Sequence, residues 1–268
     1  MTGQAPKFLV FANEKGGTGK STAAVHVAVA LAAQGRRVAA IDLDGRQRTF
    51  SRYMMNRAAT RERTRKKLPM PRFETFNPHG EGIDARLDAL AAEAETVIVD
   101  TPGREDGDAA RALARADILV TPINDSFVDL DLIGEVDPES YAVRRPSFYA
   151  ELVWQSRTRR AKESGGRIDW VVLRNRLQQL EARNMRRVET ALAELAQRAG
   201  FRVIPGLSER VVYRELFPQG LTLVDIARSA QLNLSQIAAR QELREMIAAL
   251  GLPQRAPAPQ PARAAALS

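Results

Sequence analysis

The sequence predicts an α/β protein with a doubly wound, mainly parallel sheet and helices on both of its faces. Its apolar runs are short and continuous rather than alternating, as in strands that are covered on both sides. Longer helical patterns separate these runs, and strand–helix–strand order implies right-handed crossovers between parallel strands. The 268 residues are 44% hydrophobic and 27% charged, which suffices for one substantial core. We predict a single domain at residues 1–250.

The predicted elements follow one another from the N-terminus. The first strand, KFLVFA at 7–12, leads into a helix from about Ser21 to Gln34, and Gly35 stands just past its end. Helical stretches separate the later strands, and one of them covers 178–199. These later strands are expected at 36–44, 96–100, 117–123, 170–175 and 201–206.

Two segments depart from this alternation. Residues 57–67 carry six cations and one Glu, and we expect a helix extension or an exposed loop. This segment is a weaker candidate for binding DNA, because the charges of such a run are ordinarily just solvated. Residues 251–268 are rich in Pro and Ala, and we expect a disordered tail. That tail has no bulky apolar face, so a C-terminal membrane anchor is not expected.

Composition excludes several classes of protein. Without cysteine the chain has no disulfide framework, thiolate zinc site, iron–sulfur cluster or thiol nucleophile. Only two histidines, His26 and His79, are present, which excludes a His-rich metal site. The chain has no apolar run of membrane-spanning length and no signal-peptide pattern, so we expect a cytoplasmic protein. The net charge of +8 suggests a polyanionic partner.

The segment NEKGGTGKST, residues 13–22, lies between the first strand and its helix. Backbone N–H groups of a Gly-rich turn converge on phosphate oxygens, and the helix N-terminus adds the positive end of its dipole. Lys20 is placed to reach the β- and γ-phosphates and Ser21 to bind Mg²⁺. Glu14 stands where the standard pattern has its first glycine, and Lys15 is a second lysine within the loop. The predicted nucleotide-binding residues are Glu14, Lys15, Gly16, Gly17, Thr18, Gly19, Lys20, Ser21, Thr22 and Asn175.

This pattern, K-G-G-x-G-K-S-T from Lys15 to Thr22, resembles the deviant Walker A loop of the ParA/MinD group of ATPases. The resemblance implies ATP with Mg²⁺ and a homodimer that encloses two ATP molecules. It also implies a catalytic role for Lys20 and for Lys15, which in this group reaches the nucleotide of the other subunit. Composition alone predicts no such dimer.

Two carboxylates end the second predicted strand, in AAIDLD. Asp42 and Asp44 are two residues apart, so on a strand they project from one face at the carboxyl end of the sheet, where ligands bind. Phosphoryl transfer needs a carboxylate for Mg²⁺ and a group that positions the attacking water. By the resemblance, Asp44 acts on the water and Asp42 lies toward the metal. The alternative for either is a strand-end residue that caps the following helix.

Asp100 ends the strand TVIVD and precedes Thr101-Pro102-Gly103, the switch II position of the group. Its carboxylate is expected to meet Mg²⁺ through water, as is that of Asp42. The Asn-Lys-x-Asp guanine signature is absent, which argues against GTP. Asn175 stands where relatives place a residue against the adenine edge, and a helix N-cap is its alternative role.

The resemblance narrows to the MipZ family of division-site positioning ATPases. It is carried by residues 41–53, 146–157, 170–177 and 206–223, and by Asp44-Gly-Arg-Gln-Arg where partitioning ParA proteins have Asp-Pro-Gln. The implied function is a slow, dimerising ATPase switch that binds ParB, inhibits FtsZ assembly and binds double-stranded DNA without sequence preference as an ATP dimer. The implied location is the nucleoid, with enrichment toward the cell poles.

A DNA-binding surface is predicted from the helix at 178–199. Arg183, Arg187 and Arg198 fall within roughly 60° of one another, away from the apolar stripe. Arg202, Arg210 and Arg214 follow closely in the sequence. Arginines without interleaved aromatics suit phosphate contacts, although a solvated face is the alternative.

Two other functions remain open from the sequence. A chromosome- or plasmid-partitioning ParA would share ATP, the dimer and DNA but not FtsZ inhibition. A dethiobiotin synthetase-like enzyme would use the same loop on a small organic acid, without DNA or a dimer switch.

Overall fold

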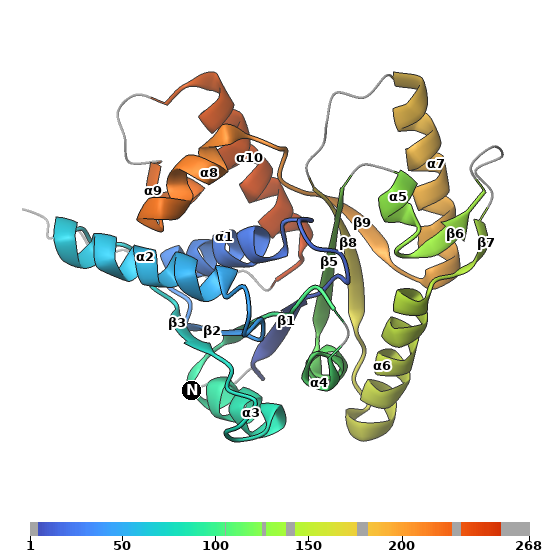
Figure 1. Cartoon of the computed structure of the whole chain (residues 1–268), viewed down its shortest axis with the longest axis horizontal. Coiled ribbons are helices and arrows are strands. Elements are labelled where there is room, and N and C mark those ends of the chain that lie inside the picture. The colour runs from blue at the N-terminus through green and yellow to red at the C-terminus, as the bar shows by residue number, and fades with distance from the viewer. Residues whose placement is uncertain are drawn as a thin grey trace, which may run out of the picture.

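The computed structural model describes residues 5–104, 106–124, 127–137, 143–175, 182–226 and 232–252. Within these residues the predicted sheet is confirmed, with seven strands in the order β3–β2–β4–β1–β5–β8–β9, every neighbouring pair parallel (Figure 1). The strands are β1 (Lys7–Phe11), β2 (Val38–Asp42), β3 (Arg72–Thr75), β4 (Thr96–Asp100), β5 (Ile118–Asn124), β8 (Asp169–Asn175) and β9 (Arg202–Pro205).

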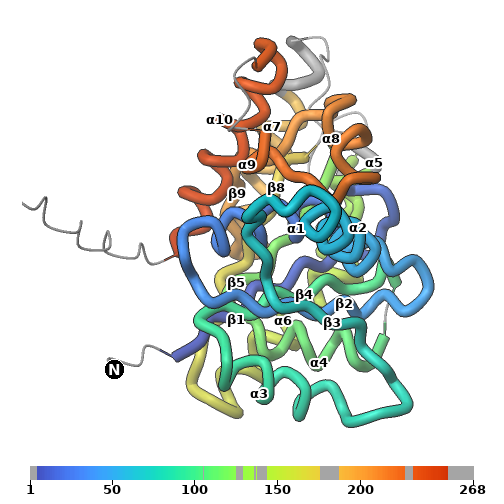
Figure 2. The backbone as a smooth tube through the Cα atoms, turned by 90° about the vertical axis from the view of Figure 1, so that its left-hand side faces the viewer, coloured from blue at the N-terminus to red at the C-terminus, as the bar shows by residue number. Residues whose placement is uncertain are grey.

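Helices cover both faces of this sheet, as predicted (Figure 2). One face carries α1 (Lys20–Ala33), α2 (Thr49–Thr64), α8 (Val211–Leu216), a 3₁₀ turn (Phe217–Gln219), α9 (Leu223–Ile226) and α10 (Leu234–Ala249). The other carries α3 (Ile83–Glu93), α4 (Gly107–Arg115), α6 (Phe148–Ser164) and α7 (Ala182–Ala199). The short α5 (Phe127–Leu130) and the antiparallel hairpin of β6 (Gly134–Val136) and β7 (Val143–Pro146) follow β5.

Alternate side chains of each central strand enter opposite cores. In β1, Phe8 and Val10 pack with α3, α4, α6 and α7, whereas Leu9 and Phe11 pack with α1 and α10. Both cores are apolar, which is why these strands read as continuous hydrophobic runs. The sequence therefore predicts where these strands lie, but not which of their side chains enter which core.

The structure adds elements that the sequence analysis did not predict. The edge strand β3 is four residues long and half-exposed, with the sequence RFET, so it lacks an apolar run. The hairpin β6–β7 is similarly short and charged. The strand predicted at 36–44 ends at Asp42, so Asp44 lies in the following loop rather than on the same strand face.

Most of the charged segment 57–67 is helical, because α2 continues to Thr64. Arg57 is fully buried, although the sequence places it in a charge run. It donates to both carboxylate oxygens of Asp225, at 2.7 and 2.9 Å, and to the carbonyls of Pro69 and Gly220. This ion pair fixes α2 against the α8–α9 region, so Arg57 is a structural residue.

The predicted tail from 251 falls outside the described residues after Leu252. No described helix is both long and apolar enough to cross a membrane.

Candidate nucleotide-binding site

The carboxyl ends of three neighbouring strands meet where the candidate site lies. Phe11, the last residue of β1, is in register with Asp100 of β4, and Asp100 is in register with Asp42 of β2. The loop after β1 and the carboxylates after β2 and β4 are thereby brought together. This is the edge at which open α/β sheets bind ligands.

One side chain and two glycines determine the backbone conformation of the loop between β1 and α1. Asn13 is buried; its Oδ1 accepts from the N–H of Lys15 at 2.6 Å and its Nδ2 donates to Pro122 O at 2.5 Å. Gly17 and Gly19 have φ of +78° and +86°, which other residues rarely adopt. The backbone then enters α1 at Lys20, where first-turn N–H groups lack helical acceptors and suit an anion.

Lys20 lies inside the site rather than on its surface. Its Nζ donates to Lys15 O at 3.1 Å, and the residue is only 8% exposed. Burial lowers the pKa of Lys20, and the charges of Asp100 and Asp44 oppose that shift. The ammonium is thus held under the loop that would surround phosphates.

Asp100 is buried, and neither carboxylate oxygen meets hydrogen-bond geometry with a donor among the described residues. Burial first, and the charge of Asp42 second, raise the pKa of Asp100 to about 8, while the nearby Ser21 hydroxyl and Lys20 ammonium oppose that shift. A buried carboxylate without a donor is costly and calls for a partner. Mg²⁺ fits, because it binds through one or two carboxylates, a hydroxyl and substrate phosphates rather than an all-protein cage.

Asp42 and Asp44 both bind backbone N–H groups. The two oxygens of Asp42 accept from Asp44 N at 3.0 Å and from Ser51 N, in the first turn of α2, at 2.9 Å. Oδ1 of Asp44 accepts from Arg46 N and Gln47 N at 3.1 and 2.9 Å. Asp42 therefore caps the turn into α2, the alternative that the sequence left open, while Asp44 is only partly buried and faces the loop.

Lys15 forms an ion pair within its own chain. Its Nζ lies 3.1 Å from Oδ1 of Asp129 in α5, and the Asp129 side chain is 8% exposed. The other oxygen, Oδ2, accepts from Asn124 N at 3.0 Å. No pattern in the sequence indicates this partner, which is 114 residues away in an element of four residues.

A pocket of about 390 Å³ adjoins the N-terminus of α1. Asn175, Leu207, Ser208, Tyr213 and Phe217 contribute to its wall. The amide of Asn175 is already used, because Nδ2 donates to Thr18 O at 2.8 Å and Oδ1 accepts from Leu207 N at 2.9 Å. Asn175 therefore ties the loop to the β9–α8 segment and forms part of the wall of this pocket. No sequence motif marks Ser208 and Tyr213, so their place in the wall of this pocket was not predicted.

The six predicted DNA-binding arginines do not form one cluster within the chain. Arg202 binds Asp169 through two nitrogens and donates to Ala249 O, and Arg210 pairs with Glu242 at 2.5 Å. Arg198 pairs with Glu194 at 2.6 Å and Arg187 is exposed, both on α7, whereas Arg214 lies on α8 across the sheet. Arg214 is 76% exposed, 3.7 Å from Glu209. The side chain of Arg183 lies outside the described residues.

The parallel sheet with this glycine–lysine loop defines a P-loop nucleotide-binding protein of the ParA/MinD type. More particularly, the family model described as ATPase MipZ matches residues 7–254, and the chain belongs to that family. No curated protein matches the sequence.

Solved structures share the fold at low sequence identity. The ATP complex of McdA from Cyanothece is 17% identical, with a TM-score of 0.63 over 95% of this chain and 100% of that one. A plasmid partition protein from Borrelia burgdorferi bound to AMPPNP is 15% identical, with a TM-score of 0.58 over 91% and 99%. The cell division ATPase MinD of Pyrococcus furiosus is 15% identical, with a TM-score of 0.55 over 90% and 98%.

Proposed function

We propose that this chain is an ATP-driven dimerisation switch that positions the division site by inhibiting FtsZ assembly. The observation that carries the proposal is the arrangement of Lys15, Lys20 and the buried Asp100 around one glycine loop in a MipZ-family chain. A nucleotide switch needs a site that senses the γ-phosphate and a surface that changes when the γ-phosphate is bound or lost. The glycine loop would be the sensing site.

The phosphates of ATP would lie on the N–H groups of residues 14–22, with Lys20 against the β- and γ-phosphates. Ser21 and Asp100 would hold Mg²⁺, which supplies charge neutralisation when bound. Asp42 supports this site electrostatically and through its cap on α2. The nucleoside would enter the pocket beside Asn175.

Asp44 is the residue that we assign to the attacking water. Its Oδ1 is fixed by two backbone N–H groups, which orient the carboxylate at the mouth of the site. A carboxylate that orients water without a strong base nearby supports slow turnover, as a timing device requires.

Dimerisation would bring Lys15 to the nucleotide of the second subunit. For this, the ammonium must leave Asp129, to which it is bound within the chain. The ion pair therefore holds the lysine back until ATP and a partner subunit compete for it.

The output of the ATP dimer would be binding to DNA and FtsZ, with ParB capturing the monomer. Arg187, Arg198 and Arg214 are the exposed candidates for phosphate contacts, together with Arg183. A dimer doubles the number of such contacts on one duplex, so DNA affinity should fall steeply with salt.

The experiment that tests the switch is Asp44→Ala, analysed by sizing and DNA retention with ATP. We expect a trapped dimer that remains on DNA, whereas Asp88→Ala, an exposed residue on α3, should cycle like the parent chain. An Asp44→Ala chain that stays monomeric with ATP contradicts the assignment.

An FtsZ sedimentation assay then distinguishes this function from that of a partitioning ParA, which would dimerise and bind DNA but leave FtsZ polymer unchanged. A ligase of the dethiobiotin synthetase type would instead turn over only with an organic acid present.

A further inference from the structure

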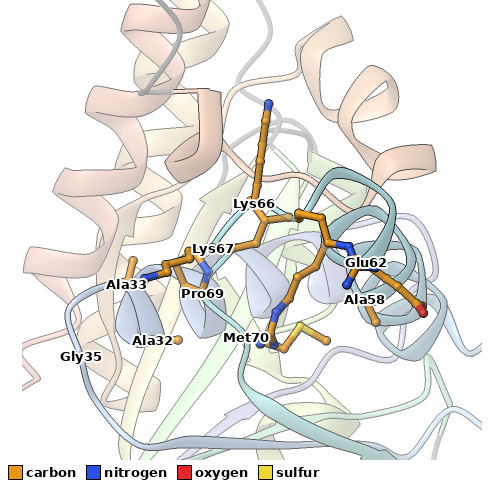
Figure 3. Close-up of a pocket in the computed structure, with 12 residues that line it drawn as sticks. Ala32, Ala33, Gly35, Ala58, Glu62, Lys66, Lys67, Pro69 and Met70 are labelled. Carbon is orange, nitrogen blue, oxygen red and sulfur yellow. The ribbon is translucent and has the colours of Figure 1, made fainter.

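A second concave site lies at the far end of α1 from the glycine loop. It is a pocket of about 810 Å³ between the C-terminal ends of α1 and α2 and the segment that leads toward β3 (Figure 3). The fourteen residues of α1 separate it from the nucleotide site by about 20 Å. We call it the basic groove, after the cations Arg61, Arg65, Lys66 and Lys67 that line it.

The charged residues that line the basic groove are mostly positive. Its four cations are exposed, and Glu62 is the one acidic residue among the lining residues. Arg61 lies in the last turn of α2 and Arg65 is the residue that follows it, where the negative end of the helix dipole favours cations.

The backbone at Arg65 turns the chain out of α2. This residue follows α2 with φ of +55° and ψ of +16°, the left-handed position where glycine is usual. A non-glycine residue there costs about 1 kcal/mol. The turn leads directly into residues 66–70, which line the groove.

Half of the twelve lining residues are apolar, and we call them the floor of the groove: Ala32, Ala33, Ala58, Leu68, Pro69 and Met70. Met55 is 61% exposed and lies one turn before Ala58 on the same face of α2, which adds an apolar side chain beside the groove. Exposed methionine is common where a surface adapts to a peptide.

We propose that the basic groove binds an acidic peptide segment of a partner protein, with its carboxylates on the rim and its apolar side chains on the floor. The cations of the groove favour an anionic ligand. The apolar floor favours an anion that also carries apolar side chains. A DNA backbone presents no apolar groups to the alanines and methionine, and a flat anionic bilayer does not enter a recess. All of the named groups come from one subunit, so binding needs neither ATP nor dimerisation.

The test is fluorescence anisotropy with a labelled 16-residue peptide of alternating Glu and Leu, without nucleotide. The variant R65E/K66E removes two cations from the groove, and K162E/R167E makes the same charge change at exposed positions in and after α6. We expect the groove variant to weaken binding at least about tenfold, since two contacts are lost and two repulsions are gained, and the control to weaken it less than about twofold. A peptide with Ser for Leu should bind more weakly.

Two further probes identify the anion. A 30-base-pair duplex and phosphatidylglycerol vesicles are measured with the same variants. Equal weakening of the peptide by both charge variants, or a groove-dependent loss for duplex or vesicles but not for the peptide, overturns the proposal.

Arg65→Gly separates binding from stability. It removes one cation and relieves the left-handed strain, so we expect Tm to rise by about 2 °C and peptide affinity to fall about threefold. A higher Tm with unchanged affinity contradicts the role of Arg65 in the groove.

Discussion

The ion pair between Lys15 and Asp129 makes a quantitative prediction about the dimer. Asp129→Asn removes the charge but keeps a side-chain oxygen for the Asn124 N–H, which now bonds Oδ2 at 3.0 Å. Lys15 Nζ lies 3.1 Å from Oδ1, with the two side chains 33% and 8% exposed. Because the lysine is partly solvated, we take the net value of the pair as about 1 kcal/mol, the upper end for exposed pairs.

A symmetric dimer breaks two such pairs, one per subunit. The gain from Asp129→Asn is then about 2 kcal/mol, or about 30-fold in the dimer dissociation constant. Sedimentation velocity across a concentration series with a non-hydrolysable ATP analogue measures it. Asp131→Asn, an exposed neighbour, is the matched control.

A double variant tests whether the release of Lys15 causes the tighter dimer. If the freed lysine is the cause, Lys15→Ala with Asp129→Asn gains nothing over Lys15→Ala alone. An Asp129→Asn chain that folds normally but dimerises no more tightly than the parent would refute the view that this pair restrains Lys15.

Three further predictions concern residues around the loop. Gly19→Ala should lower the free energy of unfolding by at least about 2 kcal/mol, because φ is +86° and a Cβ would lie 2.3 Å from the Asn175 amide; Gly16→Ala, with open space around it, should leave Tm unchanged. Burial lowers the pKa of His26 from 6.5 to about 4, so below pH 6.5 only the unfolded chain gains this proton and stability falls. In urea unfolding between pH 7 and 4.5, His26→Phe should therefore lose about 2 kcal/mol less than the parent, and equal losses would disprove the assignment. Asp100→Asn should raise Tm of the nucleotide-free chain at pH 8 and abolish the further gain that Mg²⁺ gives with ATP; a retained Mg²⁺ effect would exclude Asp100 from the metal site.

Local patterns predicted most of the sheet. The strands ending at Phe11, Asp100 and Asn175 are continuous apolar runs because both of their faces are buried, and no tertiary information was needed to find them. The strand β3 was not predicted, because an edge strand of four residues buries few apolar side chains and so has no apolar run.

Side-chain partners were much harder to predict. The sequence placed Arg57 in an exposed run and Arg202 in a DNA-binding cluster, but Asp225 and Asp169, distant in the chain, hold these guanidinium groups. An arginine has the same appearance in a sequence whether its partner is solvent, a phosphate or a distant carboxylate. Only the fold decides among these.

The same limit applies to the candidate site. The loop and Asp100 follow from spacing, because strand ends meet at one edge of a parallel sheet. The capping role of Asp42 depends on where β2 stops, a boundary that propensity sets only to within a few residues. Asp129 belongs to a four-residue helix without any motif, so its contact with Lys15 was invisible in the sequence.

The central claim is that ATP, and not ADP, assembles the dimer. Sizing with light scattering of the purified chain measures this directly, with ADP or a non-hydrolysable ATP analogue and with or without duplex DNA. We predict the 29.6 kDa monomer with ADP and twice that mass with the analogue, with DNA bound to the dimer alone. A monomer of 29.6 kDa under both nucleotides would contradict the account.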